Sequence, residues 1–155
     1  MRYKNPVLAL ILSFSLITGL AWSLEEEDYL NRVMAVDEEQ VYSLETNSHS
    51  VTLLQISGKS KSVLARWEVK YRPSSPQIAA LHGMVFVAWL EKDEADSKLH
   101  FLKFSHGETE LALVPQHTLA VENIHLAQGK NTLGMLLASS ESAVWFESEV
   151  ESLAW

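Results

Sequence analysis

Histidine has the widest chemical range of the side chains in this sequence, since it can bind a metal ion or carry a proton near neutral pH. The chain contains six: His49, His82, His100, His106, His117 and His125. A metal site needs two or three imidazoles that converge with a carboxylate, and no close pair such as His-x-His is present. The spacing therefore predicts solvated, capping or packed histidines, with no metal site and no cofactor.

Two further stretches have the composition of a ligand-binding loop without its spacing. Gly58-Lys59-Ser60 matches the end of a phosphate-binding loop, but Leu53 occupies the place of the first glycine, and a strand is expected to follow. The acidic segment 91–96 offers oxygen ligands for calcium. If Asp93 is the first ligand, however, the third position of the loop must supply the next one, and Ala95 occupies that position. We expect a turn in the first stretch and a solvated loop in the second.

Familiar hydrolase motifs are also absent from the sequence. It has no Gly-x-Ser-x-Gly, no Ser-x-x-Lys and no His-Glu-x-x-His. We therefore expect a non-catalytic protein. The alternative is a subunit or truncated remnant of an envelope enzyme, in which assembly brings together the loop residues Asp93, Glu94, Glu122 and His125.

Tryptophan could bind a sugar by stacking on its ring, but the spacing does not favour this. Trp89 and Trp145 fall on non-equivalent strands when the sequence is aligned with itself, so they form no repeated platform; Trp67 is the third tryptophan of this group. Core packing is the simpler interpretation for all three. Trp155, at the last position, is instead a candidate contact point for a neighbouring protein.

The N-terminal segment has the order of residues found in a secretory signal. Arg2 and Lys4 precede an uncharged, largely apolar run, residues 6–22, and small residues follow where a peptidase could cut. We expect residues 1–23 to be a signal peptide, with residues 6–22 as an uncleaved membrane anchor in the alternative case. Both alternatives place the rest of the chain outside the cytoplasm, in the periplasm or extracellular space.

Composition limits the partners of the exported part. Removal of residues 1–23 reduces the basic residues from 12 to 10 against 20 acidic ones, a formal charge of about −10. This charge argues against binding to nucleic acid or to anionic membrane surfaces. The chain has no cysteine, so it has neither disulfides nor a thiol for a lipid anchor. A bacterial envelope protein is the simplest interpretation.

Residues 24–35 are expected to form an acidic flank, and residues 36–155 a single β-repeat domain. Residues 26–34 could form a helix or remain disordered. The rest alternates between short runs rich in β-branched and aromatic residues and clusters of turn residues. The predicted strands are Gln40–Glu45, Ser50–Ile56, Val63–Tyr71, Ile78–Leu81, Met84–Leu90, Lys98–Ser105, Leu111–Val114, Ile124–Ala127, Thr132–Ala138 and Ala143–Ser148.

The predicted strands repeat along the chain. Ile78–Gly83, followed by an apolar strand, corresponds to Ile124–Gly129, followed by another, at a spacing of 46 residues. A weaker copy begins near Val36. Four short strands in such a period are typical of a propeller blade, so the chain resembles a β-propeller. The resemblance implies antiparallel sheets in an incomplete array of about three blades, without a motif of any one propeller family.

A β-sandwich is the alternative fold, because antiparallel sheets often give evenly spaced strands. The sandwich predicts strands with one apolar face, whereas Met84–Leu90 and Leu133–Ala138 are apolar on both. This pattern favours blades packed on both sides. The last copy has no counterpart of Leu111–Val114, so we expect its sheet to lack an outer strand. We therefore predict self-association or a protein partner.

Overall fold

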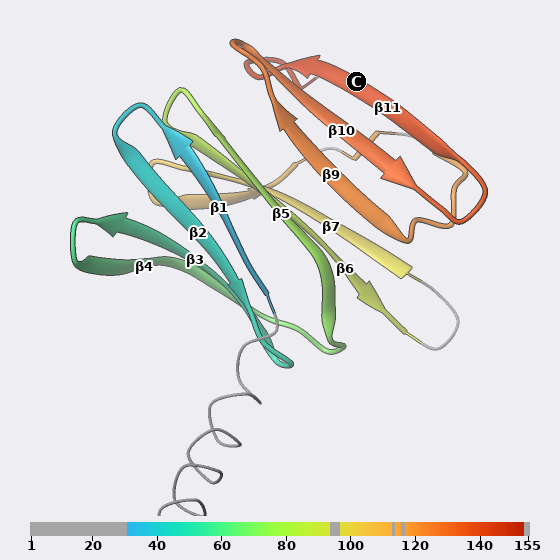
Figure 1. Ribbon diagram of the computed structural model, residues 1–155, viewed down its shortest axis with the longest axis horizontal. Coiled ribbons are helices and arrows are strands. Elements are labelled where there is room, and N and C mark those ends of the chain that lie inside the picture. Colours follow the sequence, from blue (N-terminus) through green and yellow to red (C-terminus); the bar gives the residue numbers. More distant parts are fainter. Residues whose placement is uncertain (1–30, 94–96, 113, 116, 154–155) are drawn as a thin grey trace, which may run out of the picture.

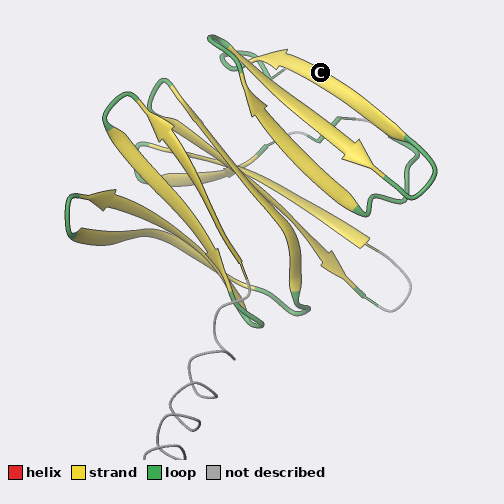
Figure 2. Cartoon of the chain, in the orientation of Figure 1, coloured by secondary structure: helices red, strands yellow, loops and turns green. Residues whose placement is uncertain are grey.

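The computed structural model describes residues 31–93, 97–112, 114–115 and 117–153. These residues form three antiparallel sheets and no helix (Figures 1 and 2). The strands follow one another in chain order within each sheet. The first sheet contains β1 (Asn31–Asp37), β2 (Gln40–Thr46), β3 (Ser50–Ser57) and β4 (Ser60–Glu68); the middle sheet β5 (Pro73–Leu81), β6 (Met84–Lys92), β7 (Ser97–Ser105) and β8 (Glu108–Leu111); and the third sheet β9 (Asn123–Gln128), β10 (Thr132–Ala138) and β11 (Ala143–Glu149).

The all-β prediction is confirmed, and the turns that support it lie at the expected positions. His82-Gly83 and His106-Gly107 each join two strands, with φ of 52° and 74° in the first turn and 51° and 83° in the second. Positive φ at both residues is the geometry of two-residue hairpins, which matches the natural twist of the strands. Glu38, with φ of 52°, makes the β1–β2 turn without a glycine.

The middle sheet is buried on both faces. Along β6, alternate side chains enter two separate apolar clusters, and none of these side chains is more than 2% exposed. This confirms the prediction of two buried faces for this strand, which needs a packed layer on each side. Three of the side chains pack toward the first sheet and three toward the third: Val85, Val87 and Trp89 in one cluster, Phe86, Ala88 and Leu90 in the other.

The third sheet packs one of its faces against the middle sheet. Leu133, Met135 and Leu137 of β10 pack against the middle sheet and are fully buried. On its other face Leu136 is half-buried, while Gly134 is covered by Trp145 of the same sheet. Among the described residues, no further layer packs on this face. The expectation of a layer on each side of Leu133–Ala138 is therefore met on one side.

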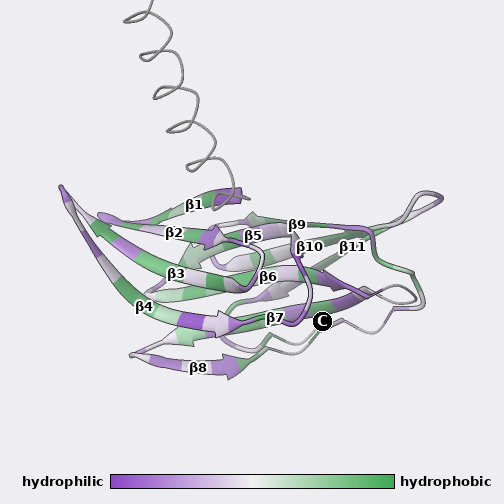
Figure 3. Cartoon of the chain, turned by 90° about the horizontal axis from the view of Figure 1, so that it is seen from below, coloured by the Kyte–Doolittle hydropathy of each residue, from purple (hydrophilic) through white to green (hydrophobic). Residues whose placement is uncertain are grey.

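The first strands of the three sheets, β1, β5 and β9, lie side by side (Figures 1 and 3). Polar side chains link their ends. The Asp37 carboxylate accepts a hydrogen bond from the Gly83 N–H at 2.7 Å, which joins the first two sheets. The Gln128 side chain accepts one from the Ala80 N–H at 3.3 Å and donates one to the Val36 carbonyl at 3.4 Å. One amide thus links all three sheets.

Two predicted elements differ from the observed ones. Residues 31–37 form strand β1, so the helix considered for residues 26–34 is wrong from Asn31 onward, and the first sheet begins before residue 36. The strand expected at Leu111–Val114 lies earlier, as β8, because the two-residue turn His106-Gly107 starts the pairing of β7 with β8 at Ser105 and Glu108. The third sheet has three strands, without the outer strand, as predicted.

The last strands of the sheets, β4, β8 and β11, are free edges among the described residues, and each is charged. Figure 3 shows β4 and β8 on the side of the molecule opposite β1, β5 and β9. Charged side chains at an edge discourage uncontrolled strand pairing. The charges are of both signs in β4 and acidic in the other two strands: Lys61, Arg66 and Glu68 in β4, Glu108 and Glu110 in β8, Glu147 and Glu149 in β11.

Replacement of Phe86 by alanine should lower the free energy of unfolding by about 3–5 kcal/mol, the usual cost of truncating a buried phenylalanine. Phe86 is fully buried and stacks on Phe101 with ring centroids 6.2 Å apart. Urea denaturation followed by circular dichroism measures the change. Leu111→Ala is the control, because Leu111 is 80% exposed and its loss should change stability by less than about 0.5 kcal/mol. Equal effects would contradict the two-faced burial of β6.

Candidate functional site

The outer face of the first sheet, which points away from the middle sheet, carries exposed apolar side chains. The strand register places Met34, Ser43, Leu54 and Val63 in one row across all four strands. Met34 and Val63 are 58% and 64% exposed, and Val36 of the next row is 54% exposed. Several exposed apolar side chains on one face make that face a candidate for contact with another molecule.

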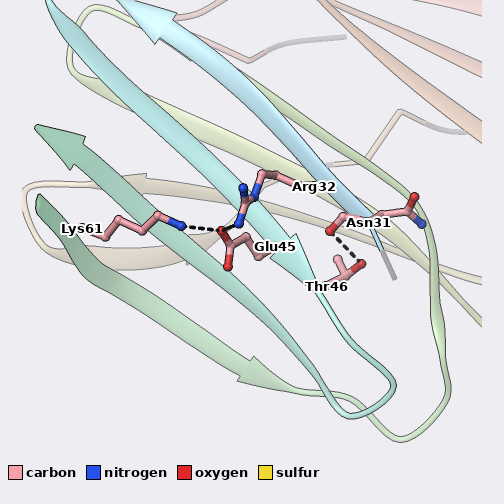
Figure 4. A network of polar contacts seen from close by, with 5 residues as sticks. All are labelled: Asn31, Arg32, Glu45, Thr46 and Lys61. Atoms are coloured by element: carbon pink, nitrogen blue, oxygen red, sulfur yellow. Dashed lines mark hydrogen bonds and ion pairs between the residues drawn. The ribbon is translucent and has the colours of Figure 1, made fainter. Parts of the chain in front are cut away.

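An ion-pair network crosses the same face (Figure 4). Glu45 of β2 binds both Arg32 of β1 and Lys61 of β4, the latter at 3.3 Å. Lys61 reaches Glu45 across β3, at the level of Leu54. Three strands are therefore held together by one carboxylate, which orders this side of the sheet. Exposed pairs of this type contribute at most about 1 kcal/mol each, so their effect is mainly on the shape of the surface.

Ser43 lies in the centre of this face. Ser43 is fully buried, and its hydroxyl has no hydrogen-bond partner among the described residues. A buried hydroxyl without a partner costs about 1–3 kcal/mol. Its neighbours in the row are Met34 and Leu54, so the surface there is apolar around one polar atom.

The outer face of the third sheet has a different character. Trp145 of β11 is 50% exposed and lies over Gly134 of β10, where an added Cβ atom would be 2.1 Å from its ring. Glycine at this place lets the indole lie flat on the strand. The two carboxylates of this face, Glu147 and Glu149, are exposed, and the strands contribute no lysine or arginine to it.

A hollow of about 680 Å³ lies at the β6–β7 end of the middle sheet. Asp93, His117 and Glu122 are among the residues that line it. Of the residues in the enzyme alternative, Asp93 and Glu122 therefore share a hollow, whereas His125 lies on the outer face of β9 and Glu94 is outside the described residues. In the described part of the chain, no three His, Cys, Asp or Glu side chains are grouped closely enough to hold a metal ion.

Glu91 and His100 form a half-buried hydrogen-bonded pair, with Nε2 and Oε2 2.8 Å apart. The His100 ring stacks on Trp89, with centroids 4.8 Å apart. The other Glu91 oxygen accepts hydrogen bonds from the N–H groups of Lys70 and Tyr71, in the link between the first two sheets, at 2.8 and 3.4 Å. A hydrogen bond from the Lys70 ammonium to the Tyr71 side chain raises the pKa of Lys70. This arrangement anchors the link between the first two sheets.

Sequence reasoning did not single out Glu91, because it occurs in an acidic run that looked like a solvated loop. Two of the other candidates have structural roles. Gly58 and Lys59 form the β3–β4 turn, as expected, and the His82 ring is 3.1 Å from the Lys130 carbonyl.

The tryptophans differ from one another. Trp67 and Trp89 pack together with ring centroids 5.6 Å apart, which confirms core packing for this pair. Core packing is wrong for Trp145, because β11 turns it to the outer face. Trp155 lies outside the described residues.

Comparison with known proteins adds no assignment: no protein-family model matches the chain, and no curated protein matches it significantly. Among the described residues no helix is long and apolar enough to cross a membrane.

Replacement of Glu91 by alanine should lower the free energy of unfolding by about 1–3 kcal/mol, because it leaves the buried His100 ring and two backbone N–H groups without their acceptor. Glu110→Ala is the matched control. Its ion pair with Lys103 is exposed, so its loss should cost at most about 1 kcal/mol. Urea denaturation of both variants tests this, and a larger effect of Glu110→Ala would contradict the anchoring role of Glu91.

Replacement of Gly134 by alanine should displace the Trp145 ring from β10, because the new methyl group would occupy its place. Acrylamide should then quench the tryptophan fluorescence of Gly134→Ala more strongly than that of the wild type. In a Trp145→Phe variant, Gly134→Ala should leave the acrylamide quenching unchanged. Unchanged quenching in the first pair would show that the ring does not lie on Gly134.

Proposed function

We propose that this chain is an exported, non-catalytic β-repeat module of the cell envelope that binds protein through the outer faces of its end sheets. In this proposal the three sheets are consecutive blades of an incomplete β-propeller-like array. Binding, rather than chemistry, is the activity.

The observation that carries the proposal is the contrast between the middle sheet and the end sheets. Both faces of β6 in the middle sheet are buried, whereas each end sheet leaves one face without a packed layer among the described residues. Met34, Val36 and Val63 on one side and Trp145 on the other remain exposed. Repeat arrays whose terminal units lack a polar cap are poorly soluble on their own, so a partner is expected to cover these faces.

The propeller-like arrangement is supported by the order of the strands. Each sheet begins with the strand that lies beside the first strand of its neighbour, as in blades around a common axis. Export is supported by the signal-like residues 1–23. The high negative charge is consistent with protein rather than nucleic acid as the partner.

The test is chemical cross-linking in cells that produce the full chain. We expect the chain to cross-link to protein in the envelope fraction, and Val63→Asp to reduce the product at least tenfold, because it places a charge in a surface that becomes buried. Val63 is 64% exposed, so the substitution leaves the core untouched.

Leu111→Asp is the matched control, since Leu111 is 80% exposed but lies on the edge strand β8, away from both outer faces. It should leave the cross-linked product unchanged. A chain that forms no cross-links, or whose cross-links are equally insensitive to both substitutions, would rule out binding through this face.

A further inference from the structure

The two uncovered faces lie at opposite ends of the series of sheets. Within the chain, the first sheet packs on one face of the middle sheet and the third sheet on the other. The uncovered faces of the first and third sheets thus both point away from the middle sheet, in opposite directions along the stack. A contact between two such unlike faces is head-to-tail, and it forms a closed ring when the rotation permits.

The apolar residues of these faces complement each other in size. The first sheet offers a row of flexible or branched side chains, Met34 and Val63, with Val36 beside it. The third sheet offers the flat surface of Trp145, with half-buried Leu136 opposite it on β10. A large aromatic side chain between aliphatic ones is typical of the centre of a protein interface.

Charge favours the contact between unlike faces over the contact between like faces. The outer face of the first sheet has Arg32, Lys61 and Arg66 against Glu45 and Glu68. The third sheet contributes carboxylates alone, Glu147 and Glu149, so two copies of that face repel each other. The net positive face and the acidic face attract.

The polar links along the first strands can also continue into a second copy. Within the chain, Ser75 of β5 exchanges hydrogen bonds with the backbone N–H and C=O of Ile124 at 3.0 and 3.3 Å, and Gln77 accepts one from the Leu126 N–H at 3.4 Å. Asn123 follows Gln77 by 46 residues, is exposed, and lies on β9 at the uncovered face. The side-chain amide of Asn123, shorter than that of Gln77, is therefore available on β9 at the place that Gln77 occupies on β5.

We propose that the partner is a second copy of this chain: the outer face of the third sheet of each copy binds the outer face of the first sheet of the other. This deepens, and rests on, the proposed function. Two copies with three sheets each contain six, which is within the usual range of about four to eight blades for a closed propeller. Ring closure covers all the uncovered faces at once.

Single cysteines test which faces meet, because the natural chain has none. Thr52→Cys places a thiol on the outer face of the first sheet, in β3, and Ala143→Cys places one on the outer face of the third, in β11. The protein is recovered from cells that produce the full chain, and the two variants are mixed, allowed to exchange and treated with a flexible bismaleimide. We expect a 52–143 cross-link in the mixture, identified by mass spectrometry, and no cross-linked dimer from either variant alone.

Light scattering of the wild type should give the mass of two chains, and Val63→Asp should weaken the dimer at least tenfold while Leu111→Asp leaves it intact. Cross-links from Thr52→Cys alone or Ala143→Cys alone would mean that like faces meet, and would overturn the proposal. A light-scattering mass larger than that of two chains would overturn the closed ring of two copies.

A monomer without cross-links would also overturn the second-copy proposal. The proposed function would survive that result if a different envelope protein were cross-linked in cells and lost with Val63→Asp, and it would fail with the proposal if none were. The two failures are therefore distinguishable.

Discussion

The arrangement depends on one constraint, the burial of β6 on both of its faces. A strand whose successive side chains are all apolar cannot leave either side in water, so it requires one layer on each side. Val85, Val87 and Trp89 require the first sheet, and Phe86, Ala88 and Leu90 require the third. This places the middle sheet between the others. In the part of the chain that the structure describes, each end sheet then has one neighbour, which is why exposed apolar side chains collect on the two outer faces.

Polar contacts determine how the layers meet along β1, β5 and β9. Apolar packing is not directional, whereas the hydrogen bonds of Asp37 with Gly83 and of Gln128 with Ala80 and Val36 hold the first strands at defined positions. The Glu91 carboxylate does the same for the link between the first two sheets. Burial therefore selects the order of the sheets, and a few side-chain hydrogen bonds select their alignment.

Much of this fold is predictable from sequence because strand turns and doubly apolar strands have local signatures, as His82-Gly83 and Met84–Leu90 illustrate. Strand β1 was not predictable, since Val33 and Met34 fit a helical spacing as well as a sheet whose partner was unknown. The candidate binding surface could not be predicted from the sequence either. Whether Val63 or Trp145 is buried depends on which neighbour covers its face, and that is a property of the packed sheets.

The charged free edges constrain how such molecules can meet. Strand β8 has Glu108 and Glu110, and β11 has Glu147 and Glu149, so two chains that approach through either pair of like edges repel one another. Extension of a sheet by backbone pairing of this kind is the route to fibrous aggregates. Because the outer faces carry exposed apolar side chains while these edges carry like charges, contacts between sheet faces are favoured over lengthening of the sheets.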